Sequence, residues 1–212
     1  LFFPTGGGKT EAYLGLAAFT MALRRLKDPT INSSGVTVLM RYTLRLLTLD
    51  QLSRAAIMVC ALELERKENP AKLGIWPFEI GLWVGNAATP NRLGKKGQED
   101  ETSARSRILS YKSGKTEQMP IPLENCPWCG SRFNSNSFQL IPNSDYPTRL
   151  ELTCVNRRCQ FRSGNPLPIL TIDETIYRRL PAFLLATVDK FASLPWVGES
   201  STLFGAAVVD HD

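Results

Sequence analysis

The alternation of apolar and polar positions divides the chain into helices and strands. Residues 10–26 repeat apolar side chains at helical spacing and end in basic residues, which favours a helix. The short β-branched run at 36–40 predicts a buried strand, and we expect a second long helix over 46–66 and another strand at 79–84. The first helix gathers its apolar side chains on one face: Ala12, Leu16, Phe19, Leu23 and Leu26.

Regular periodicity is lost in the middle of the chain and returns near its end. Residues 91–118 mix glycines with charges of both signs, and we expect a solvated loop with one short amphipathic helix over 102–112. Between 119 and 164 proline, asparagine and cysteine dominate, which suggests a small inserted module. Regular elements then resume in this order: a strand at 169–172, a helix at 173–180, a strand at 182–187 and an apolar run at 206–209.

This order of elements predicts the fold class and the domain division. Strand and helix alternate on both sides of the inserted module, which is typical of an α/β fold with a parallel sheet. We expect residues 1–118 and 165–212 to form one α/β core and residues 119–164 to form the insertion within it.

Length and composition narrow the class of protein. At ~150 residues per domain, 212 residues allow about one and a half domains. The 43% of hydrophobic and 21% of charged residues exclude disorder over the whole length. No apolar run approaches the ~20 residues of a membrane span. The chain opens at Leu1 without a signal-peptide pattern, so we interpret it as cut upstream and expect a cytoplasmic protein.

Charge and histidine content bear on the chemistry. Lysine and arginine outnumber aspartate and glutamate by 25 to 20, and this net charge of +5 favours polyanionic partners without requiring them. The one histidine is His211, so the sequence offers almost no residues from which a Ser-His-Asp triad or a pair of catalytic histidines could be built.

A glycine run before the first helix is the strongest motif. Glycines allow consecutive backbone N–H groups to surround phosphate oxygens, and the following helix N-terminus adds partial positive charge. Lys9 is then expected to contact the β- and γ-phosphates of ATP, and the Thr10 hydroxyl to bind Mg²⁺. The alternative is an ordinary glycine-rich turn. The expected nucleotide-binding residues are Thr5, Gly6, Gly7, Gly8, Lys9 and Thr10.

Four of the five cysteines form a compact pattern. Cys126 and Cys129 are a C-x2-C pair, and Cys154 and Cys159 are a C-x4-C pair. Two such turns place four thiolates tetrahedrally around one structural Zn²⁺. An iron–sulfur cluster and disulfides are the alternatives, and a reducing compartment disfavours the disulfides. The fifth, Cys60, lies in a predicted helix and is expected to be a small buried residue.

The glycine run also resembles motif I of superfamily 2 helicases, in the form Pro-Thr-Gly-x-Gly-Lys-Thr at residues 4–10. At the end of the next strand, Arg41, Thr43 and Arg45 match motif Ia, which contacts the nucleic-acid backbone in that family. Residues 186–191, Ala-Thr-Val-Asp-Lys-Phe, resemble motif Ib, and Thr187 would bind a further phosphate. Contacts of this kind position a nucleic-acid strand without recognising its base sequence. An ordinary strand-to-helix junction with solvated arginines is the alternative at motif Ia.

Motif II, the Asp-Glu pair of these ATPases, has no clear match. Asp210 follows an apolar run at a suitable distance, but His211 and not glutamate comes next. Asp173 and Glu174 form the right pair in the wrong order, before motif Ib, and Asp173 is better interpreted as the N-terminal acid of a helix. We favour a motif II beyond Asp212 and keep Asp210 as the candidate within the chain.

The chain resembles, more narrowly, the large helicase of bacterial DISARM phage-defence systems, and this resemblance is carried by residues 40–48, 126–130, 177–181 and 186–192. The resemblance implies the first RecA-like domain of an ATP-driven DNA helicase or translocase with an inserted zinc ribbon. ATP, Mg²⁺ and Zn²⁺ are the implied cofactors. DNA, a second helicase lobe and other DISARM subunits are the implied partners, and the fragment alone is expected to be inactive. The alternatives are a non-hydrolysing, nucleic-acid-binding zinc module on a degenerate P-loop domain, and another P-loop nucleotide enzyme.

Overall fold

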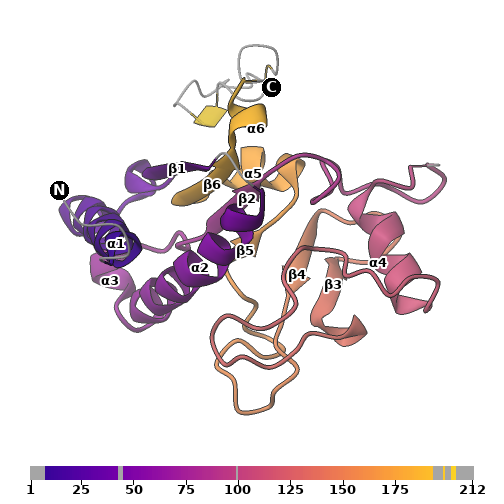
Figure 1. The fold of residues 1–212 in the computed structure, drawn as a ribbon. Helices are drawn as coiled ribbons and strands as arrows, with labels where there is room; N and C mark the ends of the chain where they lie inside the picture. The colour runs from indigo at the N-terminus through magenta and orange to yellow at the C-terminus, as the bar shows by residue number, and fades with distance from the viewer. Residues whose placement is uncertain (1–7, 43–44, 99, 193–197, 199–201, 204–212) are drawn as a thin grey trace, which may run out of the picture.

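The computed structural model describes residues 8–42, 45–98, 100–192, 198 and 202–203. Its centre is a parallel sheet of four strands in the order β1-β6-β2-β5 (Figure 1). The strands are β1 (Val38–Tyr42), β2 (Ile80–Trp83), β5 (Ile169–Leu170) and β6 (Phe183–Thr187). Every residue of the inner strands β2 and β6 is buried, as expected for continuous apolar runs in a parallel sheet covered on both faces. The predicted α/β class with a parallel sheet is confirmed.

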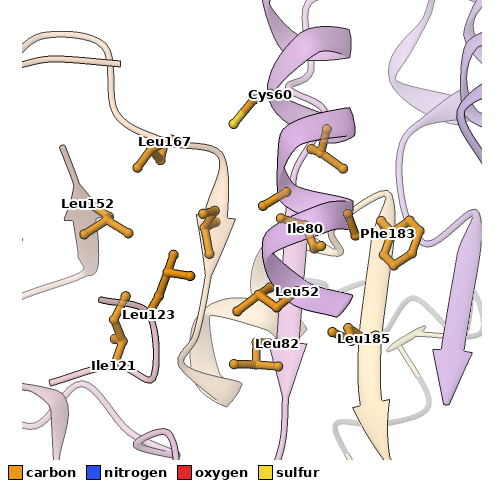
Figure 2. Packing of buried hydrophobic residues seen from close by; sticks show 14 of the residues in the cluster. Leu52, Cys60, Ile80, Leu82, Ile121, Leu123, Leu152, Leu167, Phe183 and Leu185 are labelled. Atoms are coloured by element: carbon orange, nitrogen blue, oxygen red, sulfur yellow. The ribbon is translucent and has the colours of Figure 1, made fainter. Parts of the chain in front are cut away.

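Each face of the sheet has its own hydrophobic cluster, because successive side chains of a strand point to opposite faces. Ile80, Leu82 and Leu185 face α2 (Arg45–Glu68), whose side chains Leu52 and Cys60 are seen beside them in Figure 2. The other face buries Trp83, Leu184 and their neighbours under α5 (Asp173–Arg179), where the rings of Trp83 and Tyr177 meet edge to face. The prediction that Cys60 is a small buried residue is confirmed.

The first helix forms where the sequence predicts it, but packs through a different face. Helix α1 (Lys9–Lys27) contacts α2 and α3 (Pro70–Leu73), and its buried residues are Ala17, Met21 and Arg25. The side chain of Arg25 is buried over the ring of Phe78, with 5.0 Å from its guanidinium carbon to the ring centroid. Three of the five predicted apolar positions are exposed instead, by more than half of their surface: Leu16, Phe19 and Leu26.

A buried ion pair between Glu63 and Arg66 holds the C-terminal end of α2 against the turn that follows it. Arg66 donates to both carboxylate oxygens of Glu63 at 2.7 Å and to the carbonyls of Gly74 and Ile75 at 3.1 Å. Glu63 also accepts a hydrogen bond from the backbone N–H of Phe78. Gly74 has φ 79°, and a Cβ there would meet the carbonyl of Pro29 at 2.6 Å, so this turn requires glycine. The network holds the turn that leads into β2.

Between β2 and β5 the chain builds a second group of elements at the end of the molecule opposite α1 (Figure 1). Helix α4 (Ala104–Lys112) packs beside an antiparallel hairpin of β3 (Phe138–Ile141) and β4 (Arg149–Leu152), with Tyr111 edge to face on Phe138. The sequence does not predict this hairpin. The core is continuous, since Leu123, Leu152 and Leu167 of this segment join the cluster under α2 (Figure 2).

Most of the predicted boundaries lie within two residues of the observed ones, but two short α-helices in the described part of the chain have no counterpart in the sequence prediction. These are α3 and α6 (Val188–Ala192), and α6 follows β6 directly. The predicted apolar run at 206–209 lies outside the described residues. Within the described part, no helix has the length and apolar character needed to cross a membrane.

Gly81 offers a test of the packing between β2 and α5. A Cβ at this position would lie 2.8 Å from Pro181, 2.9 Å from Leu184 and 3.4 Å from Ile176. Overpacking of this kind costs about 1–3 kcal/mol, so Gly81→Ala should lower the midpoint of thermal unfolding. Gly15 is the matched control, because it lies in α1 and an added methyl group there would have nothing within 4 Å. Gly15→Ala should raise the midpoint slightly through helix propensity, and equal midpoints for the two variants would contradict this packing.

Candidate metal centre and the carboxyl edge of the sheet

The four clustered cysteines converge in space. Cys126, Cys129, Cys154 and Cys159 place their sulfur atoms within 4.8 Å of one another. The Sγ atoms of Cys126 and Cys159 are 3.9 Å apart, and those of Cys129 and Cys154 are 3.5 Å apart. With Zn–S bonds of about 2.3 Å, tetrahedral ligands lie about 3.8 Å from each other. The donor set and its spacing therefore fit one zinc ion, and all five cysteines are free of disulfides.

Backbone turns orient the sulfur atoms. In the first turn the N–H of Gly130, which has φ 75°, donates to the carbonyl of Cys126 at 2.8 Å. In the second, the N–H of Asn156 lies 3.4 Å from Sγ of Cys154, and that of Phe161 lies 3.4 Å from Sγ of Cys159. N–H groups directed at sulfur stabilise thiolate charge, as the outer shell of a metal site does. The ring of Trp128, within the first turn, packs edge to face on Phe161 and joins the two turns.

The ionisation of these thiols couples metal binding to protons. Burial raises the pKa of Cys126 and raises that of Cys154 to about 11. At Cys129 burial acts in the same direction, but hydrogen bonds from Ser131 and the neighbouring cysteines outweigh it and lower the pKa to about 6. A metal that binds all four as thiolates must displace protons from the buried members.

The glycine run lies only partly in the described part of the chain. Gly8 is the residue before α1 and has φ 72°, a conformation that glycine adopts without strain. Lys9 is exposed and Thr10 is half-buried, both in the first turn of α1. An ion pair between Glu11 and Arg54 connects this turn to α2. Thr5, Gly6 and Gly7 lie outside the described residues.

Two of the predicted backbone-contacting residues lie at the carboxyl edge of the sheet. Arg41 and Thr187 come near the ends of the adjacent strands β1 and β6, where Arg41 pairs with Ala186 and Tyr42 with Thr187. Arg41 is exposed, and its guanidinium lies 5.7 Å from the ring centroid of Phe191. Phe191 is half-buried beneath this guanidinium. Thr43 and the side chain of Arg45 lie outside the described part.

The acidic pair at the start of α5, Asp173 and Glu174, forms contacts with other parts of the chain. Asp173 is buried and forms an ion pair with Lys190 of α6, which also donates to Oδ1 of Asn91 at 3.2 Å. Burial raises the pKa of Asp173, and the hydrogen bond and charge of Lys190 act in the opposite direction. Strand β5, which precedes α5, lies at the opposite edge of the sheet from β1, but the ion pair connects Asp173 to α6 at the end of β6. The interpretation of Asp173 as a helix-start acid fits its place in α5, and Asp210 lies outside the described residues.

Sequence reasoning misses the role of Lys190. The residue falls within the motif Ib pattern, yet nothing in the sequence predicts that it reaches Asn91, 99 positions away, and Asp173. The burial of a lysine beside a buried aspartate is visible only in the structure.

Comparison with known proteins agrees with the narrower resemblance. No model of a known protein family matches the chain. Over 97% of its length, however, the chain is 39% identical to the protein named "DISARM protein DrmA" of Bacillus paralicheniformis (strain ATCC 9945a / NCIMB 11709 / CD-2). This chain is similar to DrmA.

The extent of the match bears on both sites. Because the aligned part takes in nearly the whole chain, the similarity to DrmA extends over the sheet and the cysteine segment together. The chain spans only 18% of the length of DrmA. The expected resemblance to the DISARM helicase is therefore confirmed.

Proposed function

We propose that this chain is part of the first motor lobe of an ATP-dependent DNA helicase or translocase that acts in phage defence. The lobe would have a RecA-like P-loop fold, with residues 1–118 and 165–212 as its core and residues 119–164 as a zinc-ribbon insertion. The observation that carries this proposal is the 39% identity to DrmA over 97% of the chain. The glycine run, the parallel sheet and the cysteine cluster support it.

The nucleotide would bind at the start of α1. Helix N-termini that follow glycine turns attract phosphate, because their N–H groups are unpaired and carry partial positive charge. Gly8, the residue before α1, has a left-handed conformation that glycine adopts without strain, and Lys9 is exposed. Lys9 and Thr10 would hold phosphate oxygens and Mg²⁺, with Thr5, Gly6 and Gly7 completing the loop. Hydrolysis of bound ATP would supply the free energy for movement.

DNA would lie across the carboxyl ends of β1 and β6. Arg41 offers an exposed guanidinium there, and Thr187 ends the neighbouring strand. Thr43 and Arg45 follow β1 in sequence and would extend the same contact. Since these groups suit phosphate oxygens, they would position the DNA and supply salt-dependent affinity without base recognition.

Zinc would have a structural role. Four cysteine ligands leave no open coordination position for a substrate, which is the arrangement of structural sites. The cytoplasm suits thiolates of this kind, since it keeps them reduced. Other DISARM subunits are the expected partners of the longer protein.

The proposal is tested by ATP hydrolysis in the full-length protein with and without DNA. A motor hydrolyses ATP slowly alone and faster with DNA. A P-loop enzyme of another kind would hydrolyse ATP without a response to DNA, and a degenerate domain would bind DNA without hydrolysis. Either of these last two results would overturn the motor assignment.

A further inference from the structure

The residue Lys190 lies where three distant parts of the chain meet. Its side chain is 15% exposed, and that of its ion-pair partner Asp173 is 7% exposed. Its Nζ also donates to Asn91, 3.2 Å away. Removing a lysine and an aspartate from water carries a desolvation penalty that their attraction does not always repay. An ion pair that is largely removed from water is therefore better explained by what it positions than by its contribution to the free energy of unfolding.

The partners of Lys190 are the two ends of one excursion of the chain. Between β2 and β5 the chain leaves the sheet, forms α4, the β3–β4 hairpin and the cysteine cluster, and then returns to the sheet. We call residues 91–168 the intervening segment. Asn91 is its first residue, and Asp173 begins the helix just after the return. The two ends are also bonded directly, since the N–H of Glu174 donates to the carbonyl of Asn91 at 3.1 Å and that of Leu93 to the carboxylate of Glu174 at 3.0 Å.

Lys190 itself lies in α6, within the turn that begins with Thr187 at the end of β6; we call it the Thr187 turn. Helix α6 has only five residues and follows β6 without a loop, so its direction is set by what holds its side chains. Lys190 is held by Asp173 and Asn91, and Phe191 lies beneath the guanidinium of Arg41. These contacts fix the turn both to the base of the intervening segment and to the end of β1.

We propose that Lys190 is a positioning residue. Together with Asp173 and Asn91 it orients the Thr187 turn for contact with the DNA backbone, and it connects that turn to the base of the intervening segment. This inference rests on the proposed function, because it assumes that the turn contacts DNA. Lys190 itself does not contact DNA in this arrangement, since its ammonium group is directed inward to the carboxylate of Asp173.

The sign of the charge change separates positioning from direct contact. Asp173→Asn raises the net charge by one, and Lys190→Met lowers it by one. If Lys190 bound phosphate directly, Asp173→Asn would leave DNA binding unchanged or tighter, and Lys190→Met would reduce the salt dependence by about one counterion. If Lys190 positions the turn, both variants weaken the response to DNA, although their charges change in opposite directions.

The experiment uses the full-length protein and a single-stranded oligonucleotide as the DNA. We expect both variants to raise the DNA concentration for half-maximal ATPase stimulation by about tenfold, as for residues that act without touching the ligand. The salt dependence of DNA binding should keep its slope. Lys96→Met is the matched control, because it removes one lysine from an exposed ion pair with Asp145 and should leave the half-maximal concentration unchanged.

A double variant separates an effect on the Thr187 turn from loss of the folded state. Asp173→Asn leaves a partly buried lysine without its carboxylate, which is destabilising, whereas replacing both charges of such a pair by apolar residues is often neutral. The double variant Asp173→Leu/Lys190→Met should therefore unfold near the parent temperature and still need about tenfold more DNA. Parental DNA dependence in this folded double variant, or tighter DNA binding in Asp173→Asn, would overturn the positioning role. If the parent protein shows no DNA-stimulated ATPase, the proposed function fails instead.

Discussion

Replacing Lys9 by alanine in the full-length protein should lower DNA-stimulated ATP hydrolysis by about 100- to 1,000-fold. The proposed site gives Lys9 the part of a fixed positive charge on the phosphates, and losing one preorganised electrostatic contact of this kind costs about 10²–10³ in turnover. Lys9 is exposed in the first turn of α1, so the substitution removes no buried contact and the fold should be kept. The measurement is the steady-state rate of phosphate release at saturating DNA.

Lys27 provides the control for this variant. It lies in the last turn of the same helix, at the end where no phosphate is expected, and like Lys9 it is exposed. Lys27→Ala removes the same charge and should change the rate less than about twofold, as surface substitutions away from a site usually do. A Lys9→Ala protein that hydrolyses ATP at the parental rate would show that α1 does not begin a working nucleotide site.

Replacing Cys154 by serine should abolish zinc binding and unfold the segment around it. Cys154 is buried, and its sulfur is 3.5 Å from that of Cys129, so serine removes a thiolate from the centre of the cluster. Zinc supplies about 10–16 kcal/mol to small modules of this kind, far more than the hairpin of β3 and β4 can replace. Because the module shares its hydrophobic cluster with the sheet, the midpoint of thermal unfolding should fall as well.

Metal content and proteolysis measure this effect. The parent protein should contain about one zinc per chain, and Cys154→Ser should contain none and be cut between β4 and β5. The control is Cys60→Ala, since Cys60 is equally buried but lies in α2 outside the cluster. It should keep the full zinc content. A zinc-free parent protein with an intact module would rule out the structural metal, and iron in its place would indicate the iron–sulfur alternative.

The parts of the fold that are predictable are those with local causes. Strand β6 is expected at 182–187 and observed at Phe183–Thr187, because a continuous apolar run leaves few other ways to bury five neighbouring side chains. The turn that closes each cysteine pair is predictable for a similar reason, because its contacts lie close together in sequence. The two pairs then meet through sulfur contacts between residues 25 and 33 positions apart.

The parts that sequence reasoning misses depend on distant partners. The four-residue strands of the β3–β4 hairpin are too short for their alternation to stand out. The buried face of α1 uses Ala17 and Met21 with Arg25, whose guanidinium lies over the ring of Phe78, a residue far away in sequence. The contacts of Lys190 join residues up to 99 positions apart. No local pattern carries information of this kind.

The exposed face of α1 bears on how the chain behaves when it is made alone. Leu16, Phe19 and Leu26 are each exposed by more than half of their surface. Exposed apolar side chains that gather on one face promote association between molecules. A sample of residues 1–212 is therefore expected to self-associate at the concentrations needed for crystals or NMR spectra. The substitutions Leu16→Lys and Phe19→Lys would improve its colloidal stability without touching the buried side of the helix.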